Sequence, residues 1–256
     1  MKRFSRWVLL VFAAIPHSGV AQESQPESIN SGRPGFNETL GIIPAWRVQQ
    51  EMGYVFTRDG SSREHGVGQM IRIGTGGGTE AQIGINSYVM TRGTGGHAGG
   101  LEDSSIGFKV KLAEEGARFR LLQPAIALVA GSSLPTGVDA EKQWQPQSKL
   151  ALGWTLTERL AVSSTLASSY ASQNQERFWQ RAGGLSLAYG LTSKVGCYAE
   201  YFGYVPDSSK GSNSNFVGGG ITYLAGSTLQ LDLNWGHRLN TEASTYFLGT
   251  GLSKLW

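Results

Sequence analysis

Three histidines beyond the first 21 residues, His65, His97 and His237, are the side chains best suited to acid–base or metal chemistry. A hydrolase would need one of them beside a nucleophilic serine, with a third polar group orienting the ring. All three fall in predicted loops, and no histidine and serine pair along one face of a predicted strand. A metal site would need them to converge with a carboxylate such as Glu64 or Asp103, which the sequence does not indicate. We therefore expect no enzyme activity, no catalytic residue, no metal and no cofactor.

Charged side chains recur on one face of many alternating segments. In the clearest, Ser104–Ala113, Ile106 and Phe108 point to one side while Lys109 and Lys111 point to the other. An Arg or Lys facing lipid near the bilayer midplane costs about 2–4 kcal/mol, so in a membrane barrel such residues should face the lumen. The candidates for a charged, selective lumen are Arg47, Glu51, Arg72, Lys109, Lys111, Lys149, Glu200 and Asp232. The same residues could instead pair with one another and fill a narrow barrel, and the sequence leaves both interpretations open.

The segments that carry these residues follow one another from Ala45 to the C-terminus. About twelve extended runs, each of roughly ten residues, are separated by turn-forming residues. The predicted strands are 46–57, 69–75, 80–91, 104–113, 118–134, 147–156, 160–171, 177–190, 194–205, 215–224, 228–236 and 244–255. An even number of such strands is typical of a bacterial outer-membrane barrel. The sequence therefore predicts an all-β, antiparallel, up-and-down transmembrane barrel.

The predicted connections alternate in length. Those at 76–79 and 225–227 are short, whereas those at 58–68 and 92–103 are long and polar. This alternation indicates short periplasmic turns and longer extracellular loops. Aromatic residues near both strand ends suggest two belts at the lipid–water boundaries, with Tyr204 assigned to the long-loop belt.

The first 44 residues differ from the predicted barrel at 45–256. Residues 1–21 combine an N-terminal positive charge, a short apolar core and small residues before a cut, which predicts a cleaved signal peptide. Residues 22–44 are polar and are expected to form a periplasmic leader. Removing residues 1–21 takes away three of the 22 basic residues, which leaves 19 basic against 19 acidic residues. Charge therefore gives no reason to expect nucleic-acid binding.

Several short motifs resemble a family of bacterial outer-membrane proteins labelled putative meta-pathway of phenol degradation. They are residues 32–36 (GRPGF), 42–44, 50–54, 103–112, 134–137, 216–220, 229–232 and 248–252. The resemblance covers most of the chain after residue 21. It implies an outer-membrane barrel and a channel for small organic, often aromatic, compounds, and it implies no catalytic residues.

Three functions compete. We expect an outer-membrane channel for passive uptake of small organic solutes through a charged lumen. The alternatives are a structural or interaction barrel with a packed lumen and, with less support, an outer-membrane hydrolase. The expected partners are outer-membrane lipid, a small-molecule solute, and the barrel assembly machinery, which would recognise the last strand ending at Trp256.

Overall fold

The computed structural model describes residues 29–93, 96–116, 121–138, 143–173, 176–207, 213–240 and 245–256. The signal peptide predicted at residues 1–21 lies outside these ranges, as do residues 22–28 of the predicted leader. Within the described ranges, no helix has the length and apolar character required to cross a bilayer.

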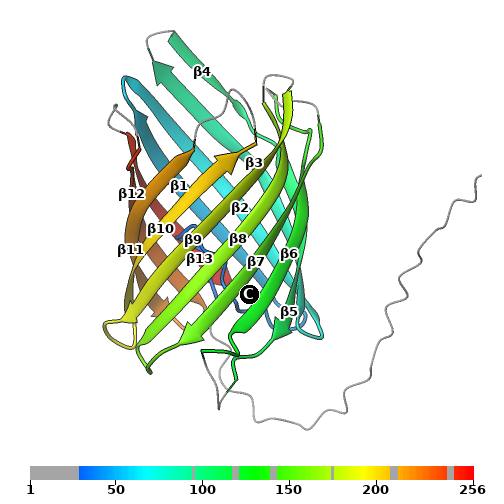
Figure 1. Ribbon diagram of the computed structural model, residues 1–256, viewed down its shortest axis with the longest axis vertical. Helices are drawn as coiled ribbons and strands as arrows, with labels where there is room; N and C mark the ends of the chain where they lie inside the picture. Colours follow the sequence, from blue (N-terminus) through cyan, green and yellow to red (C-terminus); the bar gives the residue numbers. More distant parts are fainter. Residues whose placement is uncertain are drawn as a thin grey trace, which may run out of the picture.

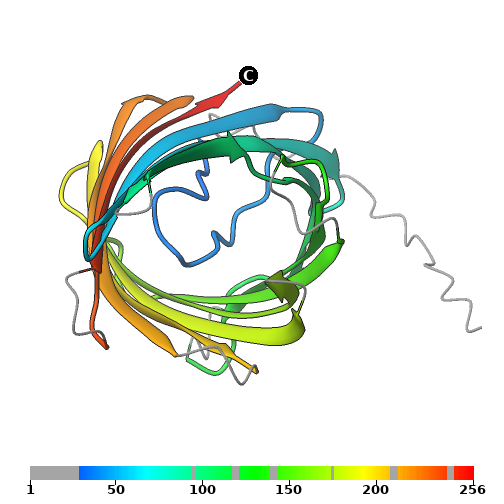
Figure 2. The same ribbon diagram turned by 90° about the horizontal axis from the view of Figure 1, so that it is seen from above.

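The described residues fold into antiparallel strands that close on themselves (Figure 1, Figure 2). The strands are β1 (Val48–Asp59), β2 (Ser62–Gly76), β3 (Thr79–Gly93), β4 (Gly96–Leu101), β5 (Ser104–Ala113), β6 (Ala125–Leu134), β7 (Gln145–Thr155), β8 (Leu160–Gln173), β9 (Glu176–Gly190), β10 (Val195–Pro206), β11 (Ser214–Gly226), β12 (Leu229–Arg238) and β13 (Thr245–Leu255). Pairing of β1 with β13 and of β2 with β3 completes the circle. The remaining strand, β4, pairs with the outer end of β3 and extends past the rim. The twelve predicted strands are all present, which confirms the predicted barrel.

The two ends of the barrel carry different connections. One end holds the turns between β2 and β3 and between β11 and β12, together with the C-terminal Trp256. We call it the short-turn end. The opposite end, which holds β4 and the connections from β6 to β7 and from β10 to β11, is the long-loop end.

Strands continue through two of the predicted long loops. The predicted loop 58–68 is taken up by β1 and β2, which meet at a turn containing Gly60 with a φ of 57°. Glycine tolerates this conformation because it has no Cβ. The predicted loop 92–103 contains the end of β3 and all of β4. Ladder hydrogen bonds join backbone groups, so polar side chains do not stop a hairpin from extending into water. The histidines expected in loops lie instead in strands: His65 in β2, His97 in β4 and His237 in β12.

One predicted strand is too long. The sequence predicts a strand over 118–134 after a short turn at 114–117, but β6 begins only at Ala125. Pro124 has no N–H to donate to a ladder, which favours a strand start just after it. The described parts of the connection are residues 114–116 and 121–124, and residues 121–124 form a turn at the short-turn end. Residues 118–120 of the predicted strand lie outside the described ranges.

The two faces of each strand separate as the alternation predicts. Phe108 is 47% exposed on the outside of the wall, beside the similarly exposed Ile106 and Leu112. Lys109, between them in sequence, is 0% exposed. Apolar side chains on the other strands, such as Leu185 and Leu233, also cover the outer surface. An apolar outside with buried charges inside is the arrangement that a barrel needs in lipid.

Placing a charge on the outer face should block assembly. Phe108→Arg is expected to make insertion and folding less favourable by about 2–4 kcal/mol, because the guanidinium would face lipid. Refolding into lipid vesicles, followed by heat-modifiable gel mobility, would measure this loss. Phe108→Leu keeps the face apolar and should refold like the wild type. Equal refolding of the arginine variant would mean that the inner and outer faces are assigned the wrong way round.

Residues 29–44 lie inside the barrel and not in the periplasm, which corrects the predicted leader (Figure 2). Ile29 N–H donates to the Ser227 carbonyl at 2.7 Å, and Trp46 N–H donates to the Gly74 carbonyl at 2.8 Å. Both contacts are at the short-turn end, so the chain enters and leaves the lumen through the same end. We call residues 29–44 the lumenal segment. Its sequence has no strand alternation, and its polar groups bind side chains of the wall.

Candidate functional site

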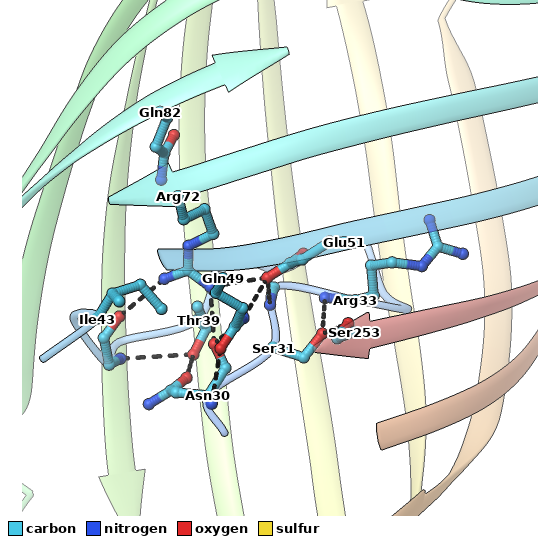
Figure 3. Close-up of polar contacts among 12 residues, drawn as sticks. Asn30, Ser31, Arg33, Thr39, Ile43, Gln49, Glu51, Arg72, Gln82 and Ser253 are labelled. Carbon is cyan, nitrogen blue, oxygen red and sulfur yellow. Dashed lines mark hydrogen bonds and ion pairs between the residues drawn. The ribbon is translucent and has the colours of Figure 1, made fainter. Parts of the chain in front are cut away.

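Arg72 on β2 is the centre of the polar contacts that hold the lumenal segment (Figure 3). Its Nε and Nη2 donate to the two carboxylate oxygens of Glu80 at 2.8 and 2.9 Å. Its Nη1 donates to Glu51 at 2.9 Å and to the Asn30 carbonyl at 2.7 Å, and Nη2 also reaches the Gly41 carbonyl at 3.2 Å. All five guanidinium N–H groups thus have acceptors. Arg72 therefore ties two wall strands to both halves of the lumenal segment.

The two carboxylates beside Arg72 also bind the backbone of the lumenal segment. Glu51 accepts from the Gly32 N–H at 2.9 Å, and Glu80 accepts from the Ile43 N–H at 2.9 Å. The Gln49 amide donates to Glu51 at 2.7 Å. The lumenal segment has no ladder of backbone hydrogen bonds of its own. The carboxylates therefore accept hydrogen bonds from backbone amides that would otherwise be buried without a partner, which would cost folding free energy.

A second cluster holds the middle of the lumenal segment. Glu38 of the segment lies 3.2 Å from Lys109 Nζ and 3.3 Å from Lys149 Nζ. The backbone N–H of Glu38 donates to Thr165 Oγ1 at 2.8 Å. Burial alone would raise the pKa of Glu38, but Lys149, Lys109 and Arg72 outweigh burial and hold that pKa below its usual range. Glu38 therefore acts as a carboxylate that pairs with two strands at once.

Asp232 and Glu200 bind the first half of the lumenal segment from the opposite wall. Asp232 on β12 lies 3.4 Å from Arg33 Nε. Glu200 on β10 accepts from the Phe36 N–H at 2.9 Å and from the Asn37 side-chain amide at 3.3 Å. Both carboxylates are nearly fully buried.

The wall is shaped around the side chains of the segment. A Cβ at Gly153 on β7 would lie 1.9 Å from Leu40 Cδ1, and a Cβ at Gly251 on β13 would lie 2.2 Å from Arg33 Nε. Such separations are far below van der Waals contact, so a larger residue at either glycine would force the side chain of Leu40 or Arg33 to move.

Six of the eight predicted lumen residues meet the lumenal segment. They are Glu51, Arg72, Lys109, Lys149, Glu200 and Asp232. The other two lie near the short-turn end: Arg47 Nε donates to the Trp256 carbonyl, and Lys111 pairs with Glu114 at 2.8 Å.

Sequence reasoning missed Glu38, Glu80 and Arg33. Glu80 shares a face with Gln82 in β3, so period-two alternation could have placed it inside. Glu38 and Arg33 lie in a stretch without alternation, and no local signal marks them as buried.

An aromatic cluster also faces the lumen. Phe36 of the segment stacks on Phe202 with ring centroids 4.8 Å apart, and Phe202 stacks on Phe216 at 5.0 Å. Tyr204 meets these rings edge-on, at 5.7 Å from Phe36. Tyr204 therefore does not belong to the outer aromatic belt, which corrects its prediction. Residues 200, 202 and 204 share a strand face, so assigning Glu200 to the lumen already required Tyr204 to lie there too.

Cavities remain on both sides of the lumenal segment. One of about 610 Å³ opens toward the short-turn end and is lined by residues 30–35, the start of β8 and the end of β9. Another of about 390 Å³ lies toward the long-loop end, between residues 34–36, β10, β11 and β13. A third of about 270 Å³ includes Lys149 and Thr165. The segment therefore divides the lumen without filling it.

The histidines do not form a centre. His65 Nδ1 lies 2.7 Å from the Tyr54 hydroxyl, and the three histidines belong to three different strands. In the described part of the chain, no three His, Cys, Asp or Glu residues are grouped so that they could hold a metal ion.

A closed antiparallel wall with an apolar outer surface and a polar interior defines an outer-membrane β-barrel. The family model described as "Putative MetA-pathway of phenol degradation" matches residues 31–254, and the chain belongs to this family. The match includes most of the lumenal segment.

Comparison with solved structures supports the same fold. The chain is similar to the COG4313 outer membrane channel from Pseudomonas putida F1, with a TM-score of 0.67 and 12% identity over 88% of this chain and 99% of that chain. It is also similar to the NanC porin, with a TM-score of 0.56 and 9% identity over 80% of this chain and 98% of that one. The KdgM porin matches with a TM-score of 0.50 and 9% identity, over 80% and 98% of the two chains. No curated protein matches the chain in sequence.

Proposed function

We propose that this protein is an outer-membrane channel for small organic solutes, and that the lumenal segment forms its constriction. The observation that carries the proposal is a divided lumen, with cavities of about 610 and 390 Å³ on opposite sides of the segment. A barrel whose interior served only as a core would be packed at close to crystal density. The similar structures are named as a channel and as porins, and the family description refers to phenol degradation, which supports a channel for small organic solutes.

The contacts of the segment suit a constriction better than a core. The charged residues buried at the segment are Glu51, Arg72, Glu80, Lys109, Glu200 and Asp232. Among the described residues, the buried apolar cluster at the segment is small and consists of Ile29, Ile43 and Leu255. Charged and polar groups can be rehydrated when water enters, whereas an apolar core loses its main stabilisation.

The predicted lumen residues divide into two roles in this proposal. Glu51, Arg72, Lys109, Glu200 and Asp232 hold the segment, because they are buried against it. Lys149 remains 35% exposed and lines the third cavity, of about 270 Å³, so a passing ion would meet its charge. We propose no enzymatic role, and we propose assembly into the outer membrane through the C-terminal strand β13.

The alternative is an interaction barrel with a closed lumen. The observation in its favour is the complete pairing of Arg72, which leaves no donor of this side chain free for a solute. Planar-bilayer recording from the refolded chain without residues 1–21 separates the two. Discrete conductance steps would support the channel. Heat-modifiable mobility shows whether the protein is folded. A folded protein that gives no conductance steps, with or without added solutes, would support the closed barrel.

Removing the charge of Lys149 should change ion selectivity. Lys149→Gln is expected to shift the permeability ratio toward cations by about twofold or more, because charges lining a pore set its selectivity. Lys111→Gln is the matched control, since Lys111 lies near the short-turn end and pairs with Glu114. Reversal potentials under a salt gradient would measure both. An equal shift in the two variants would place the selectivity outside the cavity that Lys149 lines.

A further inference from the structure

The cavity on the long-loop side of the lumenal segment has an aromatic lining. Phe202 and Phe216 of the wall form ring contacts there with Phe36 of the segment and with Tyr204, and Phe247 contacts Phe216. The rings of Phe36, Phe202 and Phe216 are nearly parallel, with interplanar angles of 2° and 9° between neighbours. At about 390 Å³, the cavity falls within the size range of small-molecule sites. The lining therefore suits a ligand that carries one aromatic ring.

The charge of this cavity comes from a single carboxylate. Among the described residues that line it, Glu200 is the one charged side chain, and none of them is Lys, Arg or His. The hydrogen bonds that Glu200 accepts come from the neutral Phe36 and Asn37. The other carboxylates at the lumenal segment each pair with a cation: Glu38 with Lys109, Glu51 and Glu80 with Arg72, and Asp232 with Arg33. Glu200 thus has no cationic partner among the described residues and lies beside the rings.

A further acceptor lies at the edge of the same cavity. The Asn234 side-chain amide donates to the Pro34 carbonyl at 3.2 Å, and its Oδ1 is buried with no partner among the described residues. A buried acceptor without a donor is uncommon, and a ligand N–H would satisfy it.

We propose that this cavity binds small aromatic ammonium ions, such as arylalkylamines, and that it forms the substrate site of the proposed channel. The aromatic faces attract the cation through their negative quadrupole and pack against the ligand ring. Glu200 supplies the opposite charge, and Asn234 supplies an acceptor for the ammonium N–H. An aromatic acid of the same size would bring a second negative charge toward Glu200, which disfavours its binding.

Three ligands that share one ring and differ in charge test this inference. Isothermal titration calorimetry on the refolded chain without residues 1–21, in detergent at neutral pH, would compare 2-phenylethylamine, 2-phenylethanol and phenylacetate. We expect the amine to bind at least about tenfold more tightly than the acid, with the alcohol between them. Glu200→Gln should reduce the preference for the amine over the acid to about twofold. Phe216→Leu should weaken the binding of all three ligands.

Controls separate binding from folding. Glu114→Gln removes an exposed carboxylate at the short-turn end and should leave all three affinities unchanged. Heat-modifiable mobility checks that each variant is folded. If a variant fails to fold, the affinities of the wild type for the three ligands still test the inference. The inference is wrong if the wild type binds phenylacetate as tightly as the amine, if no ligand binds, or if Glu200→Gln keeps the preference. Loss of ligand binding with intact conductance overturns this inference alone, whereas amine binding without conductance overturns the proposed channel.

Discussion

Removing residues 29–44 should raise the single-channel conductance at least about threefold. Twelve-stranded barrels lie between filled eight-stranded barrels and open sixteen-stranded porins, so an emptied lumen of this size should pass ions freely. Wall pairing between neighbouring strands does not use these residues, and β1 begins only at Val48. We therefore expect a chain that starts at Ala45 to refold as a barrel. Planar-bilayer recording in concentrated salt would measure the change.

A second variant keeps the chain length and removes three anchors of the segment. Arg33→Gln, Phe36→Ser and Glu38→Gln together break the contacts with Asp232, Phe202 and the two lysines. We expect a conductance between those of the wild type and the deletion variant, with larger fluctuations. If the deletion variant is folded by heat-modifiable mobility and its conductance equals that of the wild type, the segment does not limit the passage.

Replacing Arg72 should release the segment from the wall. Arg72→Gln leaves Glu51 and Glu80 buried without their cation, and breaking a buried ion pair costs about 3–5 kcal/mol. Water that enters the lumen can hydrate the freed carboxylates, so we expect a cost of about 3 kcal/mol, or roughly a hundredfold in the equilibrium between the docked and released segment. Cleavage after Glu38 by a glutamate-specific protease, followed by mass spectrometry of the fragment that begins at Thr39, would report the released segment.

Two further variants show whether the guanidinium geometry matters. Arg72→Lys keeps the charge but loses the bidentate contact to Glu80, so its cleavage rate should lie between those of the wild type and Arg72→Gln. Arg159→Gln removes an exposed arginine from the turn between β7 and β8 and should cleave at the wild-type rate. Wild-type cleavage of Arg72→Gln would mean that Arg72 stabilises the wall and not the segment.

The wall of the barrel could be predicted because its signal is local. Side chains alternate along a strand with a period of two, so the neighbours of Lys109 already assign it to the inner face. The same rule placed Glu51, Arg72, Glu200 and Asp232 inside, where they are buried. The rule failed at two places. Pro124 makes β6 begin later than the alternation predicts. Tyr204 was assigned to the outer aromatic belt because it is aromatic, although it shares a strand face with Glu200.

The sequence thus determined the strands, their two faces, and with them the class of the protein. The occupied lumen depended on the tertiary structure. Residues 29–44 have no period and no ladder, and their partners are spread over the wall, from Glu51 on β1 to Asp232 on β12. Those partners are up to 222 residues away in sequence, and they converge only when the last strand pairs with the first. Alternation along a strand predicts that a charged side chain faces inward. Which residue it contacts there depends on the closed barrel, because the contacting residues come from strands far apart in the sequence.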